Sequence, residues 1–403
     1  MMNDVRGRDR QRQIDVGLLV AVYALSLFGI LCISMATYDM DVSEGQPLLS
    51  KILNSRSSMW QSIFVLVSPV VIGTVIAIPN HNYKNRAWLI YVGVLVLLCI
   101  TLVAGQVSNG LKGWLKSSIL GRSIQPCEFA KLSVLLLLAK YLSEAEKPMG
   151  TFKEFTRTMA AVIVPSVVVL LQGETGSVIV ILFMFMVMIF FAGVDKRILI
   201  GIIAVGALGI GFIVAYGLMA ENTDYRILRL LAFLDPQKYS SSGGYQIIMS
   251  QTAIGAGQRN GVGMFVPGSW TTLGFVPESS TDSVFSVVGE CFGFTGCCAV
   301  LAVYLFIVLR MLYLARYNQD KFGQLVIIGV MAMLFFHVFQ NVAMSIGFMP
   351  ITGIPLPFLS YGGSNYITNI TGVALVLSMI RERPVNAVKP LPLPKINPSR
   401  KNG

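Results

Sequence analysis

Long apolar blocks alternate with short polar segments along the whole chain. Ten blocks are long enough to cross the roughly 30 Å hydrocarbon layer of a membrane as helices. They cover residues 16–36, 58–78, 88–104, 126–143, 158–172, 175–192, 198–218, 283–309, 324–346 and 364–380. The pattern predicts an all-α integral membrane protein of about ten transmembrane helices. A large extracytoplasmic loop is expected between helices 7 and 8, and a re-entrant outer segment before helix 10.

Composition agrees with this pattern. The 403 residues are 54% hydrophobic and 13% charged, and this charged share is about half that of a soluble globular protein. The net charge of +11 is divided among short clusters between the apolar blocks, which excludes a nucleic-acid-binding surface. The six cysteines lack metal-ligand spacing and are expected to pack as small apolar residues. With His81 in a polar loop and His337 inside an apolar run, a histidine metal cluster is excluded.

The basic residues predict the orientation in the membrane. If the N-terminus is cytoplasmic, the inner segments hold 21 Lys and Arg residues and the outer segments hold 9. Cytoplasmic loops are enriched in these residues, so both termini are expected in the cytoplasm. Residues 1–383 then form one membrane domain, with the outer loop at 219–282. The proline-rich residues 384–403 are expected to form a disordered cytoplasmic tail.

Charged residues at membrane depth mark candidate functional positions, because each costs at least about 2–3 kcal/mol there. Glu128 and Lys131 lie three residues apart on the fourth span, where they can pair. A purely structural ion pair explains them equally well. Glu174 interrupts an apolar stretch in a glycine-containing turn and is expected either to partner a buried base or to belong to a site. Apart from Lys140 in the last turn of the fourth span, Lys131 is the only basic residue within a predicted span, so Glu128 and Glu174 are its candidate partners.

Two further segments lie at the outer ends of spans. Asp282 stands just before an apolar run, where it fits either a helix N-cap or an acid held at the outer mouth of the bundle. Glu290, two helical turns further, is expected to be structural. Residues 347–364 contain three prolines and four glycines among apolar residues. They are too irregular for a helix and too apolar for a surface loop, which predicts a re-entrant wall.

Taken in this order, these segments resemble the SEDS family (shape, elongation, division and sporulation proteins, including RodA and FtsW), with RodA-like members slightly preferred. The resemblance covers the chain from the first span to about Arg383. Its most specific part is Thr352–Gly363. The other matching segments are 109–114, 125–132, 172–177, 229–236, 245–263 and 281–290.

The resemblance implies a peptidoglycan glycosyltransferase in the bacterial cytoplasmic (inner) membrane. Such an enzyme polymerises lipid II into β-1,4 glycan strands on the outer face, for cell elongation and shape or for division. The implied partners are lipid II, a class B penicillin-binding protein acting as transpeptidase, and other elongation or division machinery proteins. An inverting transfer needs a base at the acceptor hydroxyl and cations at the pyrophosphate leaving group.

The resemblance also assigns roles to individual residues. Asp282 is the expected catalytic base. The expected substrate-binding residues are Lys112, Trp114, Gln125, Arg229 and Ser360. The expected intramembrane charge network consists of Glu128, Lys131, Glu174 and Glu290. For Lys112 and Arg229 a solvated loop charge is the alternative, and for Trp114 an anchor at the membrane interface. No cofactor and no metal site is required, although a divalent cation (Mg²⁺ or Mn²⁺) is compatible with a pyrophosphate leaving group.

The chain departs from the usual family pattern at several positions. Gly113 replaces an arginine, Cys127 a serine, Glu174 an aspartate, Ser279–Ser280 a histidine-containing pair, and Ser283 a phenylalanine. Two other functions remain open at this point. A flippase or transporter of the lipid-linked precursor would also place charges and broken helices in the membrane. A non-catalytic scaffold for the transpeptidase would tolerate loss of Asp282.

Overall fold

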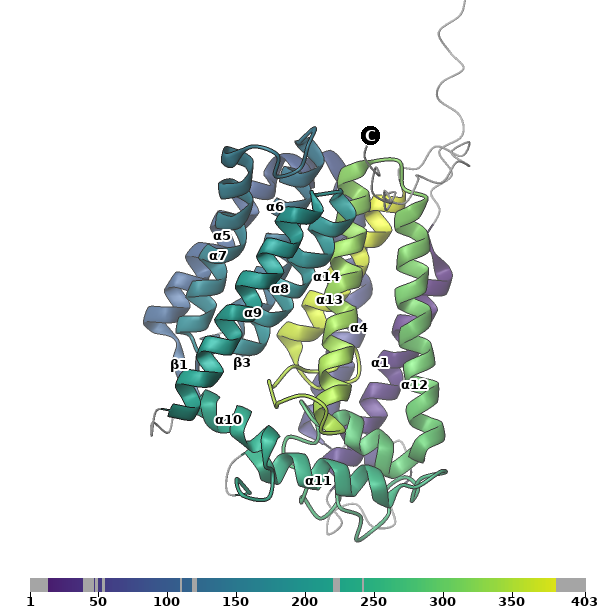
Figure 1. The fold of residues 1–403 in the computed structure, drawn as a ribbon. Helices are drawn as coiled ribbons and strands as arrows, with labels where there is room; N and C mark the ends of the chain where they lie inside the picture. The colour runs from purple at the N-terminus through teal and green to yellow at the C-terminus, as the bar shows by residue number, and fades with distance from the viewer. Residues whose placement is uncertain are drawn as a thin grey trace, which may run out of the picture.

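The computed structural model describes residues 14–38, 47, 50–52, 55–108, 111–117, 122–219, 225–240 and 243–381. Each of the ten predicted spans coincides with a long helix (Figure 1). These helices are α1 (Val16–Ala36), α4 (Arg56–Ala77), α5 (Asn80–Ala104), α6 (Pro126–Glu144), α7 (Phe152–Leu171), α8 (Thr175–Ala192), α9 (Lys196–Met219), α12 (Val284–Arg316), α13 (Lys321–Ser345) and α14 (Gly363–Arg381). Residues 1–13 and the predicted tail 384–403 lie outside the described residues.

Seven of the described helices are long and apolar enough to cross a membrane by composition alone, namely α1, α4, α5, α7, α8, α12 and α13. Helices α6 and α14 carry more polar and charged residues, and most of their side chains are buried against other helices. A helix enclosed by other helices does not face lipid, so it needs no continuous apolar surface. Its polar groups instead need hydrogen-bond partners within the bundle.

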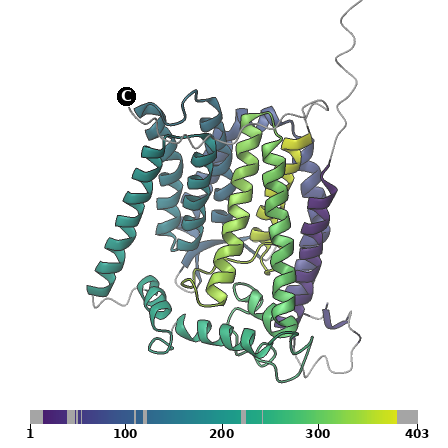
Figure 2. The ribbon, with the colours of Figure 1, turned by 45° about the vertical axis from the view of Figure 1, so that its right-hand side comes forward.

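The two ends of the bundle differ in construction (Figures 1 and 2). At one end, Arg310 pairs with Asp15 at 2.8 Å, just before α1, and Arg381 at the end of α14 donates to the carbonyl of Ile76. At the opposite end, α10 (Tyr225–Leu234) and α11 (Gly243–Ala256) lie across the helices. The first and last spans thus begin and end on the same side, opposite the large loop.

Three differences from the sequence prediction have physical reasons. The α5 helix begins at Asn80 rather than at 88, because its polar first turns are held in the bundle, where Asn80 accepts a hydrogen bond from Ser378. The α12 helix extends to Arg316, beyond the predicted 309. The segment 105–125 forms a small antiparallel sheet of β1 (Gln106–Ser108), β2 (Leu111–Ser117) and β3 (Arg122–Ile124), which is too short to give a clear period-two pattern.

The segment between α13 and α14 enters the bundle as irregular backbone. Leu356, Phe358 and Leu359 are fully or almost fully buried. A Cβ on Gly29 of α1 would lie 2.5 Å from the Phe358 carbonyl oxygen, so only glycine permits this approach. Tyr304 of α12 donates its hydroxyl to the Pro357 carbonyl. These contacts with two helix interiors give the segment the re-entrant course expected from its prolines and glycines.

Candidate functional site at the end of the bundle

Asp282 lies at the end of the large loop, two residues before α12 begins. Asp282 is half-buried, and its carboxylate accepts no hydrogen bond from any residue that the structure describes. Gly353 of the re-entrant segment packs beside it. A Cβ on Gly353 would lie 3.2 Å from Asp282 Oδ2 and 3.9 Å from Arg229 Nη1. The Asp282 carboxylate and the Arg229 guanidinium therefore both lie next to Gly353.

Arg229 reaches this position from α10. Its Nη1 donates to the Ile351 carbonyl at 3.4 Å, which ties α10 to the re-entrant segment. The aspartate and the guanidinium come from segments about fifty residues apart, and the fold brings them together. An acid with a free carboxylate beside an arginine is an arrangement that can accept a proton next to a bound anion.

The surroundings of Asp282 shift its ionisation. Burial raises the pKa of the Asp282 carboxyl from 3.8 to about 7, and the negative charges of Glu278 and Glu174 act in the same direction. Arg229 opposes this shift and lowers the pKa. A carboxylate whose pKa lies near neutrality is suited to general-base catalysis.

Glu174 lies near this site, in the turn before α8. Its Oε1 accepts a hydrogen bond of 2.7 Å from Gln125 Nε2. A Cβ on Gly113 of β2 would lie only 2.5 Å from the same Oε1, so the glycine leaves room for the longer acid. Burial raises the pKa of Glu174, whereas the Gln125 hydrogen bond lowers it. Gln125 is thus engaged by an acid of the protein itself.

The sheet that carries Gly113 is attached to this turn, because the Lys112 amide donates to the Gln172 carbonyl at 3.0 Å. The Lys112 side chain is exposed and Trp114 is half-buried. Both lie on β2, beside the Glu174 turn. Figure 1 shows β1 and β3 just above α10, in the same half of the molecule as α10 and α11.

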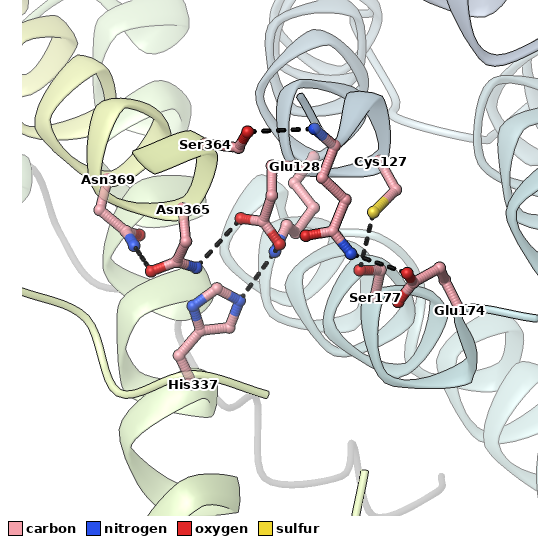
Figure 3. Close-up of polar contacts among 10 residues, drawn as sticks. Cys127, Glu128, Glu174, Ser177, His337, Ser364, Asn365 and Asn369 are labelled. Carbon is pink, nitrogen blue, oxygen red and sulfur yellow. Dashed lines mark hydrogen bonds and ion pairs between the residues drawn. The ribbon is translucent and has the colours of Figure 1, made fainter. Parts of the chain in front are cut away.

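A second group of polar residues lies inside the bundle between α6, α13 and α14 (Figure 3). Lys131 Nζ pairs with Glu128 Oε1 at 2.7 Å and lies 3.1 Å from His337 Nε2. Asn365 Nδ2 donates to Glu128 Oε2 at 3.1 Å. Lys131 and Glu128 are 1% and 3% exposed, so each relies on these contacts in place of water.

The structure gives each member of the expected network its own contacts. Among the described ion pairs, Lys131 joins Glu128 alone. Glu174 binds Gln125, and the charges of Lys131 and Glu128 act on its pKa in opposite directions, so its place in the network stays a prediction. The Glu290 carboxylate accepts hydrogen bonds from the Trp270 amide at 2.6 Å, the Thr271 amide at 2.9 Å and the Thr271 hydroxyl. Glu290 thus links the large loop to α12 and forms no ion pair with a described residue.

Ser360 lies within the backbone of the re-entrant segment, close to the acid. It is 3% exposed. Its hydroxyl donates to the Thr281 carbonyl and accepts from the Leu356 amide at 2.8 Å. The first hydrogen bond joins the re-entrant segment to the residue before Asp282, and the second lies within the re-entrant segment. Ser360 is thus a structural link beside the acid, and its contact with substrate stays a prediction.

Four residues of these sites are missing from the sequence prediction: His337, Asn341, Ser364 and Asn365. The Ser364 hydroxyl accepts a hydrogen bond of 3.0 Å from the backbone N–H of Gln125. The Asn341 side chain donates to the backbone carbonyl of Asp282. His337 and Asn341 lie four residues apart in an apolar run, which places both on one helix face. That spacing of two polar residues was the available signal.

The fold and these contacts define a multi-pass membrane protein with an acid and an arginine gathered at one end of its helices. The comparisons with known proteins agree with this class. The model of the cell cycle protein family FtsW/RodA/SpoVE matches residues 16–384. The chain therefore belongs to this family, which is the SEDS family.

Characterised relatives are similar over most of their length. The chain is 30% identical to the peptidoglycan glycosyltransferase RodA of Treponema pallidum, covering 91% of this chain and 97% of the relative. It is 32% identical to the peptidoglycan glycosyltransferase MrdB of Escherichia coli K12, covering 81% and 86%. A solved chain from work on the coordination of polymerisation and crosslinking by a peptidoglycan synthase complex superposes with a TM-score of 0.74 at 26% identity, covering 91% and 98%.

Proposed function

We propose that this chain is a peptidoglycan glycosyltransferase that polymerises lipid II into β-1,4 glycan strands, with Asp282 as the general base. The observation that carries the proposal is the position of the half-buried Asp282 carboxylate. It accepts no hydrogen bond from a described residue and lies beside Arg229 across Gly353. Family membership and the names of the relatives support the reaction class.

The chemistry follows from these two groups. The acceptor 4-hydroxyl attacks the anomeric carbon of the donor, and its proton passes to Asp282. The bond between that carbon and the pyrophosphate oxygen breaks, which releases undecaprenyl pyrophosphate and inverts the α-linkage to β. Arg229 is suited to hold the pyrophosphate, because a guanidinium matches phosphate oxygens in geometry and charge. The exposed Lys112 would supply a second cation and Trp114 a face for a sugar ring.

The orientation belongs to the same proposal. We infer that the end carrying α10, α11 and Asp282 faces the outside of the cytoplasmic membrane, and that both termini are cytoplasmic. The excess of basic residues in the opposite loops supports this direction. A transpeptidase of the class B penicillin-binding proteins is the proposed partner, supported by the synthase complex in which the similar chain was studied.

A polymerisation assay with purified protein tests the function. Lipid II is mixed with the detergent-solubilised chain, with and without its transpeptidase, and glycan is separated by length. The proposal expects chains that a β-1,4-specific muramidase degrades, together with released undecaprenyl pyrophosphate. A precursor transporter would leave lipid II intact while moving it across a vesicle membrane. A scaffold would leave lipid II intact and move nothing.

A further inference from the structure

Asp282 belongs to a segment without regular secondary structure. Residues 276–283 contain turns rather than helix or strand, and Glu278 has a positive φ of 51°. The carboxylate accepts no hydrogen bond from a described residue, so the backbone has to be fixed for the acid to point at a substrate. The surrounding fold contacts two of its serine side chains, since Ser279 donates to the Ala36 carbonyl and Ser283 accepts from Gln246, and it contacts the residues next to the acid through their carbonyl groups.

Three consecutive carbonyls of this segment accept hydrogen bonds. The Ser280 carbonyl accepts from the Tyr361 amide at 2.8 Å, and the Thr281 carbonyl accepts from the Ser360 hydroxyl. The Asp282 carbonyl accepts from Asn341 Nδ2 at 2.8 Å. Two of these donors belong to the irregular re-entrant segment. Asn341 is the one carried by a transmembrane helix.

Asn341 is fully buried on α13, and its Nδ2 donates to a second carbonyl, that of Ile354, also at 2.8 Å. Its Oδ1 has no hydrogen-bond partner among the described residues. The reversed amide would place that oxygen against two carbonyl oxygens, so only the observed orientation is favourable. One side-chain amide therefore links the backbone of Asp282 to the backbone of Ile354, the residue that follows Gly353.

We propose that Asn341 is a positioning residue for Asp282, holding its backbone carbonyl and the re-entrant segment in fixed relation on α13. This inference rests on the proposed function, in which Asp282 is the base. One turn earlier on the same helix, His337 contacts Lys131. The α13 helix thus connects the buried ion pair with the backbone of the acid.

The chain offers a matched control in the neighbouring residue. Gln340 is also a buried amide of α13, its Nε2 donates to the Pro350 carbonyl at 3.1 Å, and its Oε1 is unpartnered among the described residues. Gln340 thus holds the re-entrant segment without touching Asp282. Comparing Asn341→Leu with Gln340→Leu separates a loss of positioning from a general loosening of the loop.

Kinetics of lipid II polymerisation test the proposal. Asn341→Leu is expected to lower kcat roughly 10- to 100-fold, because a small displacement of a catalytic group has that effect, with KM within about twofold of wild type. Gln340→Leu is expected to keep kcat within about threefold of wild type. If Asn341→Leu does not fold, Asn341→Ser is used instead, because the short serine hydroxyl cannot donate to the carbonyls of both Asp282 and Ile354. Equal losses in the Asn341 and Gln340 variants overturn the proposal.

A second measurement is independent of catalysis. Carbodiimide labelling of Asp282 in the resting protein, followed by mass spectrometry, reports how its carboxyl is presented. The labelling rate is expected to change several-fold in the Asn341 variant and to stay near wild type in Gln340→Leu. Unchanged labelling in both variants overturns the positioning role even if kcat falls. An inactive wild type with altered labelling in the Asn341 variant contradicts the proposed function and leaves the positioning contact standing.

Discussion

Lys131 of α6 pairs with Glu128 at 2.7 Å inside the bundle, and its second close contact is His337 of α13 at 3.1 Å. Both ionic groups are almost fully removed from solvent. Each of the two buried charges is therefore stabilised by the other, since a buried charge without its partner is strongly unfavourable.

The first prediction concerns this pair. Lys131→Met leaves Glu128 buried without a counter-charge and is expected to lower the free energy of unfolding by about 3–5 kcal/mol. The double variant Lys131→Met/Glu128→Gln should recover most of this loss, because neither charge remains. Reversible unfolding in detergent measures both. Lys131→Met/Glu174→Gln is the control and should recover nothing, and equal recovery in the two double variants would refute the assignment of the pair.

The second prediction concerns Gly113 and Glu174. Gly113→Ala would place a Cβ 2.5 Å from Glu174 Oε1 and push the carboxylate away from Gln125. Overpacking of this kind costs about 1–3 kcal/mol, measurable by unfolding. Adding Glu174→Asp withdraws the carboxylate by one methylene and should restore stability. Gly73→Ala is a control for the added methyl group, because nothing lies within 4 Å of a Cβ there, and inside α4 it should raise stability by about 0.5–1 kcal/mol. A Gly113→Ala protein as stable as wild type would contradict the steric argument.

The third prediction concerns pH. The pKa of Asp282 is raised to about 7, chiefly by burial, and a general base acts only when ionised. Polymerisation should therefore increase as pH rises through about 7. Arg229→Gln removes the charge that lowers this pKa, so the midpoint should move to higher pH. Initial rates from pH 5.5 to 8.5 measure both midpoints. An unchanged rate across this range would contradict the role of the shifted carboxyl.

The same shift affects stability. The pKa of Asp282 is higher in the folded state than its ordinary value of 3.8, so the folded state binds more protons than the unfolded state between the two values. The resulting stabilisation is fully present at low pH and is lost as the pH rises through about 7. Asp282→Asn abolishes the titration. The stability of the Asn variant minus that of wild type, measured by thermal unfolding, should therefore be larger at pH 8 than at pH 5. A difference that does not depend on pH would show that Asp282 does not titrate in this range.

The fourth prediction concerns orientation. In a cysteine-free background, Ser240→Cys near α10 should react with an impermeant maleimide in intact cells, or in spheroplasts if an outer membrane blocks the reagent. Lys147→Cys, exposed between α6 and α7, should react only after lysis. The basic-residue count underlies this expectation. The opposite labelling pattern would place Asp282 on the cytoplasmic side and remove the proposed reaction.

The sequence predicts the helices well because hydrophobic length is a strong local signal. All ten spans coincide with helices, and the irregular segment before α14 follows from its prolines and glycines. Pairings between distant segments carry no such signal. Glu174 could be placed in a turn, but its choice of Gln125 over Lys131 depends on how α6 and α8 pack. Ser360 fits a polar site residue by type, and its burial between two backbone segments becomes apparent only in the fold.

His337 and Asn341 illustrate the same limit. A lone polar residue in an apolar run resembles an ordinary satisfied core residue, and no local pattern names its partner. The partners, Lys131 and the Asp282 carbonyl, are more than fifty residues away in sequence. Only the packing of α13 against α6 and against the end of the large loop brings them into contact.

Polymerisation of lipid II by Asp282→Asn, compared with wild type in the presence of the transpeptidase, tests the central claim most directly. Asparagine has nearly the size of aspartate. Ser283 occupies the N-cap position of α12, and the Asp282 carboxylate accepts no hydrogen bond from a described residue, so the change is expected to leave the fold intact. Asparagine cannot accept a proton near neutral pH, and loss of a general base lowers the rate by roughly two to four orders of magnitude. The account predicts a folded Asn variant that binds its partner and makes no detectable glycan. Glycan chains at near wild-type rate from that variant would contradict it.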